Sequence, residues 1–276
     1  MKNELAGKIA ELLDTVRTKK PLVHQITNYV AVNDCANITL AAGASPIMAD
    51  DIGEAGEIAA ASSALVLNIG TLNARTVQSM LAAGKSANEK GVPVVLDPVG
   101  AGASGLRDRA AAELLKQVKL AAVRGNLSEI RSVAGLSAAT RGVDAADQEA
   151  SRDARENAET VRRLARSLGC VAAVTGPVDT VSDGERTLLI RNGHPMLSSV
   201  TGTGCMCTAL VGCFCGASDD FLLASAAGIA LMGVAGELAF ERVGRLGSGS
   251  FRTALIDAVS RMDAETFAGR VRIEQI

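Results

Sequence analysis

The residues in this 276-residue chain that best suit chemistry lie in a glycine-rich segment followed by a long uncharged stretch. The segment reads Val200-Thr201-Gly202-Thr203-Gly204-Cys205-Met206-Cys207 and continues into small and apolar residues, which favour a buried helix. Gly202 and Gly204 allow a sharp turn and a close approach of another group to the backbone. Because no charged side chain occurs between Asn192 and Ser218, backbone groups would have to meet a bound charge.

A glycine turn that opens a helix presents unpaired N–H groups and the positive end of the helix dipole. Such a turn binds anions, and phosphate in particular. Gly202, Thr203 and Gly204 would form this anion site, and Cys205 in the first turn would lie beside it as a base or a hydrogen-bonding partner. A thiol at a helix N-terminus is expected to have a lowered pKa. The alternative is a strand-to-helix turn followed by a buried cysteine with no role in catalysis.

Short apolar runs alternate with helical segments along the first two thirds of the chain. We expect strands at 21–29, 45–49, 64–70, 91–98, 120–126 and 170–176, and helices at 4–18, 30–42, 73–90, 106–117 and 154–168. Residues 137–153 resemble a loop, 178–191 a hairpin around Asp183-Gly184, and the last third is mostly helical. This alternation predicts an α/β fold with a doubly wound, mostly parallel sheet and helices on both faces, in a single domain spanning 1–276.

Polar side chains gather at the carboxyl ends of the expected strands, where ligands of parallel sheets bind. Asp97 ends a strand and could bind Mg²⁺ through water, or it could cap the next turn. Asn126 and Glu129 could likewise form a helix cap, or Glu129 could lie near a metal. Asn68, Thr175 and the segment 201–205 complete this set.

Arg124, expected at the end of the strand at 120–126, could hold a phosphate with its forked donors, or it could form a surface salt bridge. An anion-binding turn, two separated acids and an arginine at one edge of a sheet suit phosphoryl transfer. That reaction depends mainly on positioning, on Mg²⁺ and on a base near the acceptor hydroxyl.

Composition excludes several other classes of function. The net charge is −2 without long blocks of one sign, which argues against nucleic acid or an anionic membrane as the main partner. The chain has one Tyr, no Trp and five Phe, so any nucleotide base would be held by aliphatic side chains. The N-terminus lacks the apolar core of an export signal, so we expect a cytoplasmic protein with free cysteines. The uncharged runs 192–218 and 221–236 favour a pair of core helices over membrane spans.

Several motifs, in order between about residues 20 and 215, resemble the hydroxyethylthiazole kinase family. They are His24-Gln25-Ile26-Thr27-Asn28, Gly43-Ala44-Ser45-Pro46-Ile47-Met48-Ala49, Leu67-Asn68-Ile69-Gly70-Thr71-Leu72, Leu96-Asp97-Pro98-Val99-Gly100-Ala101-Gly102-Ala103, Arg124-Gly125-Asn126-x-x-Glu129, Val174-Thr175-Gly176 and Val200-Thr201-Gly202-Thr203-Gly204-Cys205. The loop after Met48 departs from the family, because it carries fewer glutamates than the family's loop.

The resemblance implies a ribokinase-like fold and a thiamine-salvage enzyme. Such an enzyme transfers the γ-phosphate of ATP, with Mg²⁺, to the hydroxyl of 4-methyl-5-(2-hydroxyethyl)thiazole. The resemblance also implies a homotrimer with sites between subunits, to which Asn28 would contribute. It assigns the thiazole to Asn28, Met48 and Gly202, ATP to Arg124, Asn126 and Thr175, the metal to Asp97 and Glu129, and the base position to Cys205.

Two other functions remain open at this point. The first is a different enzyme on the same fold, such as a hydroxymethylpyrimidine kinase, another small-alcohol kinase or a nucleotide-repair dehydratase. The second is a protein that binds thiazole or nucleotide as a sensor without turnover. The presence of Cys205 where an acid is expected argues against the sugar and pyrimidine kinases, and the two acids Asp97 and Glu129 argue against a sensor.

Overall fold

The structure, a computed structural model, describes residues 2–135 and 154–276, and the expected loop at 137–153 lies outside them. In the described residues the strands are β1 (Leu22–Ile26), β2 (Ser45–Ile47), β3 (Ala64–Asn68), β4 (Val94–Asp97), β5 (Ala122–Asn126), β6 (Val171–Thr175), β7 (Asp179–Ser182), β8 (Thr187–Ile190) and β9 (Ile273–Gln275). The helices are α1 (Lys2–Lys19), α2 (Val32–Ala42), α3 (Ala55–Ala61), α4 (Ala74–Glu89), α5 (Gly105–Gln117), α6 (Leu127–Val133), α8 (Ala154–Leu168), α9 (Thr203–Cys215), α10 (Phe221–Val243), α11 (Ser248–Arg261) and α12 (Ala264–Arg270). Two 3₁₀ helices, η1 (Pro195–Ser199) and η2 (Gly244–Leu246), complete the set.

All strands join one sheet in the order β2-β1-β3-β4-β5-β6-β7-β8-β9. The pairs from β2 to β6 are parallel, whereas β7, β8 and β9 are antiparallel to their neighbours. The expected mostly parallel α/β sheet and the hairpin are therefore confirmed. Helix α3 and strand β9 were not expected. Strand β9 pairs with β8 through Ile190 and Ile273, a contact between distant parts of the chain that local pattern does not encode.

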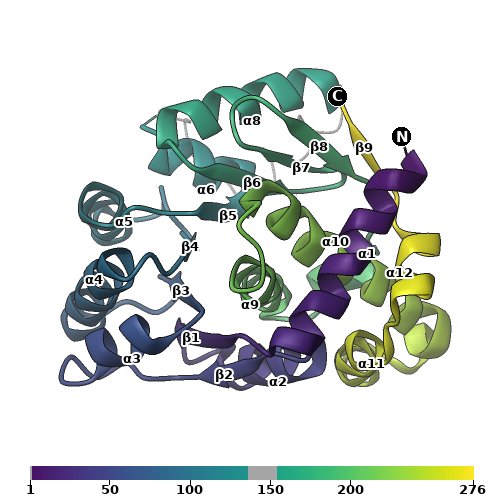
Figure 1. The fold of residues 1–276 in the computed structure, drawn as a ribbon, viewed down its shortest axis with the longest axis horizontal. Helices are drawn as coiled ribbons and strands as arrows, with labels where there is room; N and C mark the ends of the chain where they lie inside the picture. The colour runs from purple at the N-terminus through teal and green to yellow at the C-terminus, as the bar shows by residue number, and fades with distance from the viewer. Residues whose placement is uncertain (1, 136–153) are drawn as a thin grey trace.

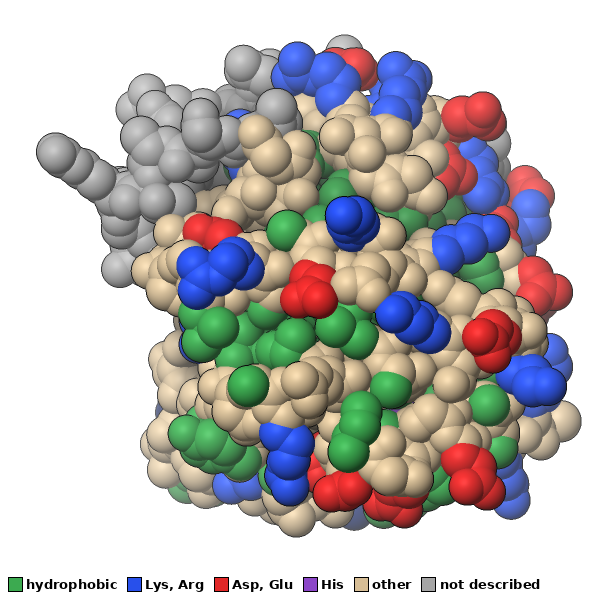
Figure 2. Space-filling view, turned by 90° about the vertical axis from the view of Figure 1, so that its left-hand side faces the viewer, with side chains coloured by type: hydrophobic (Ala, Val, Ile, Leu, Met, Phe, Trp, Pro, Cys, Tyr) green, Lys and Arg blue, Asp and Glu red, His purple; other side chains and the backbone are tan. Residues whose placement is uncertain are grey.

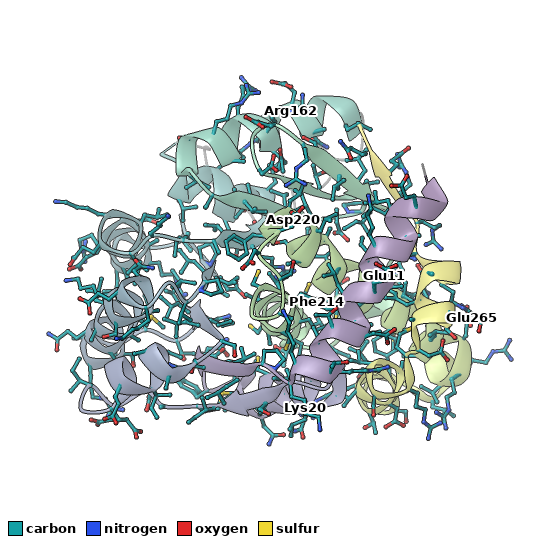
Figure 3. All side chains as sticks on the ribbon, viewed as in Figure 1. Glu11, Lys20, Arg162, Phe214, Asp220 and Glu265 are labelled. Carbon is teal, nitrogen blue, oxygen red and sulfur yellow. The ribbon has the colours of Figure 1, made fainter. Side chains whose placement is uncertain are left out.

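Helices cover both faces of the sheet, as the doubly wound prediction requires (Figure 1). Helices α1, α2, α9, α10, α11 and α12 share one apolar core, and α3, α4, α5, α6 and α8 share the other. Phe214 of α9 is fully buried and lies near the centre of the molecule (Figure 3). On the outer face formed by α3, α4 and α5, acidic and basic side chains are interspersed with apolar ones (Figure 2).

In the described part of the chain, the segment Phe221–Leu246, which comprises α10 and η2, is long and apolar enough to cross a membrane. However, 78% of its most apolar window is buried inside the protein. It packs against α9 and α11, which accounts for its composition without a membrane. The prediction that the two uncharged runs contain core helices is therefore confirmed.

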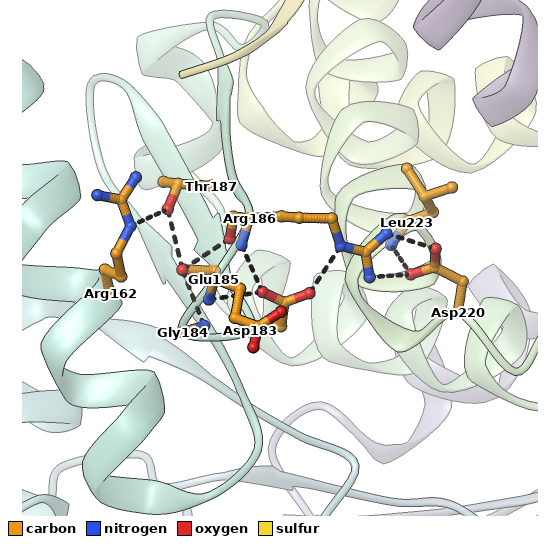
Figure 4. Close-up of polar contacts among 9 residues, drawn as sticks. Arg162, Asp183, Gly184, Glu185, Arg186, Thr187, Asp220 and Leu223 are labelled. Atoms are coloured by element: carbon orange, nitrogen blue, oxygen red, sulfur yellow. Dashed lines mark hydrogen bonds and ion pairs between the residues drawn. The ribbon is translucent and has the colours of Figure 1, made fainter.

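The β7–β8 hairpin is tied to the helical layer by charged side chains (Figure 4). The Oδ1 atom of Asp183 accepts hydrogen bonds from the backbone N–H groups of Glu185 and Arg186, at 2.9 and 2.7 Å. The guanidinium of Arg186 bonds the other oxygen of Asp183 at 2.8 Å and reaches Asp220, just before α10, at 2.8 Å. These bonds fix the hairpin relative to the helix that forms one wall of the site described below.

Helix α9 can lie close to the sheet because it carries glycine where it crosses β1 and β3. A Cβ atom added at Gly212 would lie 2.4 Å from Cγ2 of Val66 and 3.3 Å from Cγ1 of Val23. Both valines are fully or almost fully buried and β-branched, so they have little freedom to move away. Gly212 therefore sets the depth at which α9 sits, and with it the position of the helix N-terminus.

We expect Gly212→Ala to lower the free energy of unfolding by about 1–3 kcal/mol, because the added methyl overpacks this contact. Gly7→Ala in α1 is the matched control, since an added Cβ there meets nothing within 4 Å. That substitution should raise stability by about 0.5–1 kcal/mol through helix propensity. Urea unfolding of both variants measures this. Equal effects of the two substitutions would contradict the close packing of α9.

Candidate active site

The strand order reverses between β1 and β3, because β1 has β2 on one side and β3 on the other. Ligands of doubly wound sheets bind at this switch point, beyond the carboxyl ends of the strands. Asn28 follows β1 and Asn68 ends β3. Both are buried, and the Nδ2 of Asn28 donates to Oδ1 of Asn68 at 2.9 Å. The sheet thus brings the two amides together at the expected edge.

Cys205 joins this pair from α9. Its Sγ accepts hydrogen bonds from the Nδ2 of Asn28 at 3.1 Å and from the Nδ2 of Asn68 at 3.3 Å. The same Nδ2 of Asn68 also lies 2.9 Å from Oδ2 of Asp97. Asn68 therefore connects the thiol to the buried carboxylate. Asn28 donates its hydrogen bond to the Cys205 of its own chain.

The N-terminus of α9 has the open geometry expected of an anion site. Gly202 adopts φ +84° and provides no side-chain cap, and no acceptor in the described residues takes the backbone N–H of Thr203, Gly204 or Cys205. The turn does not follow a strand, contrary to our expectation for residues 201–205. It follows the 3₁₀ helix η1, to which it is fixed by the Thr203 hydroxyl, 2.9 Å from the carbonyl oxygen of Leu197.

The expected lowering of the thiol pKa is wrong. Burial and the nearby Asp97 charge raise the pKa of Cys205 above its ordinary value, although the hydrogen bond from Asn28 lowers it. The helix N-terminus does not lower the pKa below its ordinary value, because the thiol is largely removed from water and faces a carboxylate. The side chain is therefore a neutral thiol at neutral pH.

Asp97 is almost fully buried at the end of β4. Its Oδ2 accepts hydrogen bonds from Asn68 and from the Thr208 hydroxyl, the latter at 2.7 Å. Burial raises the pKa of Asp97 to about 6, although the Arg124 charge and the bond from Thr208 lower it. Its Oδ1 has no hydrogen-bond partner among the residues described, so this oxygen is available to a ligand.

Glu129 and Asn126 form the helix cap that the sequence allowed. The Asn126 side chain accepts from the backbone N–H of Glu129 at 2.9 Å, and Oε2 of Glu129 accepts from the N–H of Asn126 at 2.9 Å. The Oε1 of Glu129 accepts from the N–H of Gly100 at 2.8 Å. This carboxylate therefore joins the loop after β4 to the start of α6.

The two acids suit a partial magnesium site rather than a complete protein cage. Residues 2–135 and 154–276 contain no group of three metal-binding side chains. Mg²⁺ is commonly held by one or two carboxylates together with substrate phosphates and water. The free Oδ1 of Asp97 and the remaining lone pairs of Glu129 match that donor set.

Arg124 and Thr175 lie on adjacent strands and are joined by a 2.8 Å hydrogen bond from Nη2 to Oγ1. Arg124 lies inside β5 rather than at its end, and its buried Nε has no hydrogen-bond partner among the described groups. A Cβ atom added at Gly204 would lie 2.9 Å from Nη1 of Arg124. The guanidinium thus sits directly beside the start of α9, and the surface salt bridge considered for Arg124 is not what the structure has.

A pocket of about 660 Å³ extends from this guanidinium toward α10. Of the residues expected at the site, Arg124, Asn126, Thr175, Thr203 and Gly204 line it. Asn28, Asp97 and Cys205 lie at the β1–β3 switch point, and Met48, just after β2, is half-buried against the same core as α9. The start of α9 therefore separates a large pocket from a cluster of buried polar groups.

Three further residues belong to this region, although the sequence analysis assigned them no role at the site. Thr208 bonds Asp97, and its position three residues after Cys205 on one helix face could have indicated this. Cys207 and His194 line the large pocket. The His194 ring stacks on Phe240 with centroids 3.6 Å apart, so an aromatic pair lies beside a pocket expected to be aliphatic.

Comparisons with known proteins identify the family of this chain. A model of the hydroxyethylthiazole kinase family matches residues 13–265. Hydroxyethylthiazole kinase from Ruminiclostridium cellulolyticum is 56% identical over 274 residues, which cover 99% of this chain and 100% of that protein.

The solved structures that this chain resembles include a member of the same family. The structure of a hydroxyethylthiazole kinase protein from Pyrococcus horikoshii OT3 has a TM-score of 0.88 and 38% identity, and the match covers 98% of this chain and 99% of that one. A ribokinase-like superfamily protein from Enterococcus faecalis V583 has a TM-score of 0.60 at 12% identity, covering 90% of this chain and 89% of that one, and shows the fold alone. The chain therefore has a ribokinase-like fold and belongs to the hydroxyethylthiazole kinase family.

Proposed function

We propose that this chain transfers the γ-phosphate of ATP to the hydroxyl of 4-methyl-5-(2-hydroxyethyl)thiazole, in thiamine biosynthesis and salvage in the cytoplasm. One observation carries the proposal. The uncapped N-terminus of α9 lies between the pocket lined by Arg124 and the cluster formed by Asn28, Asn68, Asp97 and Cys205. A donor phosphate on one side and an acceptor hydroxyl on the other would meet at these free amides.

ATP occupies the large pocket in this proposal, with its phosphates toward Arg124, Asn126 and Thr175. The pocket volume of about 660 Å³ suits a nucleotide. The free N–H groups of Thr203, Gly204 and Cys205 then face the charge that develops on the transferred phosphoryl group. Amides held in place by α9 need no reorganisation during the reaction, which is the property that makes such donors effective.

Asp97 and Glu129 hold Mg²⁺ in this proposal, through the free Oδ1 of Asp97 and the outer lone pairs of Glu129. The ion supplies neutralisation of phosphate charge when it is bound. The bonds from Asn68 and Thr208 keep the Asp97 carboxylate oriented. The bond from Glu129 to Gly100 keeps the second acid near the loop that follows Asp97.

Asn28, Met48 and Gly202 bind the thiazole, and Cys205 lies next to its hydroxyl. Because the thiol is neutral, Cys205 acts at neutral pH mainly by orienting the hydroxyl through a hydrogen bond. A thiolate formed at higher pH would accept the proton of the hydroxyl more readily.

The active form in this proposal is a homotrimer with sites between subunits. Large apolar side chains are exposed beside the proposed thiazole site, where Tyr29 and Val30 follow Asn28 and Ile52 lies in the loop that follows Met48. Tyr29 is 79% exposed and directly follows Asn28. Clustered exposed apolar side chains are typical of protein interfaces, and a neighbouring subunit would cover them.

The proposed reaction predicts ADP release from ATP and Mg²⁺ that depends on the thiazole. A coupled assay with and without the thiazole measures this, beside a titration of thiazole binding. Thiazole binding without ADP release would favour a sensor over a kinase, or would indicate a phosphoryl donor other than ATP. Release that depends on a different alcohol would indicate another small-alcohol kinase.

Cys205→Ala should lower kcat while largely retaining the KM values for ATP and the thiazole, because the free amides of α9 remain. We also expect kcat of the parent to rise with pH through the alkaline range, because the pKa of Cys205 is raised above its ordinary value, and this rise to be absent in the variant. A pH series of both proteins measures the effect. Parent-like phosphorylation by Cys205→Ala would remove the thiol from the reaction and leave the amides as the main catalytic element.

Tyr29→Glu should dissociate the trimer, because it places a charge in the proposed apolar contact. Light scattering coupled to size exclusion measures the mass, and turnover should fall together with the trimer fraction. Leu246→Glu is the matched control, since Leu246 is 71% exposed in η2. A parent protein that has the mass of a monomer and still phosphorylates the thiazole would contradict the proposed trimer.

A further inference from the structure

Arg107 of α5 is placed to hold two loops of the active-site edge together. Its Nη1 donates to the carbonyl oxygens of Ile69 and Val99, at 2.7 and 2.6 Å. Its Nη2 donates to the carbonyl oxygen of Gly70 at 2.8 Å. One guanidinium thus bonds three backbone acceptors, two in the loop after β3 and one in the loop after β4.

These three backbone contacts are the side-chain hydrogen bonds of Arg107 in the described residues. No carboxylate of the described residues lies within ion-pair distance of Arg107. It is half-buried, and a Cβ atom added at Gly100 would lie 3.2 Å from its Cδ and Nε, so the loop after β4 is packed directly on it. Gly100 itself adopts φ +71°. A planar guanidinium satisfies several carbonyls at fixed angles, which a lysine ammonium does not do.

The two loops carry residues of the proposed reaction. The N–H of Gly70, whose carbonyl Arg107 holds, donates to Oδ1 of Asn68 at 2.9 Å. The amide group of Asn68 in turn contacts Sγ of Cys205 and Oδ2 of Asp97. The N–H of Ile69 donates to the carbonyl of Asp97 at 3.1 Å, which joins the two strand ends. The contacts are continuous from Arg107 through Gly70 and Asn68 to the thiol.

We propose that Arg107 is a positioning residue for phosphoryl transfer, which fixes the loops after β3 and β4 and thereby the Asn68 amide between Cys205 and Asp97. It touches neither ATP nor the thiazole in this arrangement. The proposal rests on the proposed kinase function, because it assigns Asn68 and Cys205 to the acceptor side of that reaction.

The test compares Arg107→Ala and Arg107→Lys with Arg109→Ala, an exposed arginine on the same helix. Arg107→Ala should lower kcat by about tenfold or more, because small displacements of reacting groups cost that much. Its KM for ATP should stay near the parent value, since Arg107 does not contact the Arg124–Thr175 pair. The kcat of Arg107→Lys should lie between those of the parent and Arg107→Ala, and the kcat of Arg109→Ala should equal that of the parent.

A second measurement needs neither ATP nor metal. Iodoacetamide labelling followed by peptide mass spectrometry gives the alkylation rate of Cys205 relative to that of Cys170, a half-buried thiol ahead of β6. The ratio should rise severalfold in Arg107→Ala, because the loop after β3, which keeps Asn68 against Sγ, opens more often. Cys170 serves as the internal reference for global loosening.

Three results would overturn the proposal: parent-like kcat in Arg107→Ala, an equal loss in Arg109→Ala, or a lowered kcat with an unchanged alkylation ratio. If Arg107→Ala does not fold, Arg107→Lys is judged by the same criteria. A parent without thiazole-dependent ADP release would refute the proposed function. The alkylation ratio would still decide whether Arg107 holds the site.

Discussion

The start of α9 is the constraint on which the rest of this structure depends. Three backbone N–H groups at Thr203, Gly204 and Cys205 have no acceptor among the described residues, in a stretch of sequence without charged side chains. Unpaired amides are costly when they are buried and useful when an anion binds. The fold holds them at a fixed depth, because Gly212 lets the helix lie directly on β1 and β3.

The sheet supplies the groups on both sides of these amides. Its parallel half ends in Asn68, Asp97, Asn126 and Thr175 on successive neighbouring strands. The thiol cluster lies where the strand order reverses between β1 and β3, and the large pocket lies beside β5 and β6, on the other side of the start of α9. Donor and acceptor sites on opposite sides of one helix end are an economical arrangement for group transfer, because both can use the same positive end of the helix dipole.

Burial controls the chemistry of the side chains more than their position along the helix does. The thiol of Cys205 lies at a helix N-terminus, yet its pKa is raised, and the pKa of Asp97 is raised to about 6. Both groups are removed from water, and the negative charge of Asp97 further raises the pKa of the Cys205 thiol. The hydrogen bonds of Asn28, Asn68 and Thr208 offset part of this cost, which explains why neutral amides and a hydroxyl surround the pair.

The sequence by itself determined the alternation of strands and helices, the glycine turn that opens α9, and the family, because these depend on local pattern and on motifs in fixed order. It also placed Asn68, Asp97 and Thr175 correctly at strand ends. Only the tertiary structure decided that η1 precedes the turn, that β9 closes the sheet, and that Thr208 and Arg107 support the site. The tertiary structure also decided that the pKa of Cys205 is raised rather than lowered. These features depend on contacts between residues far apart in the chain and on exclusion of water, neither of which a local pattern contains.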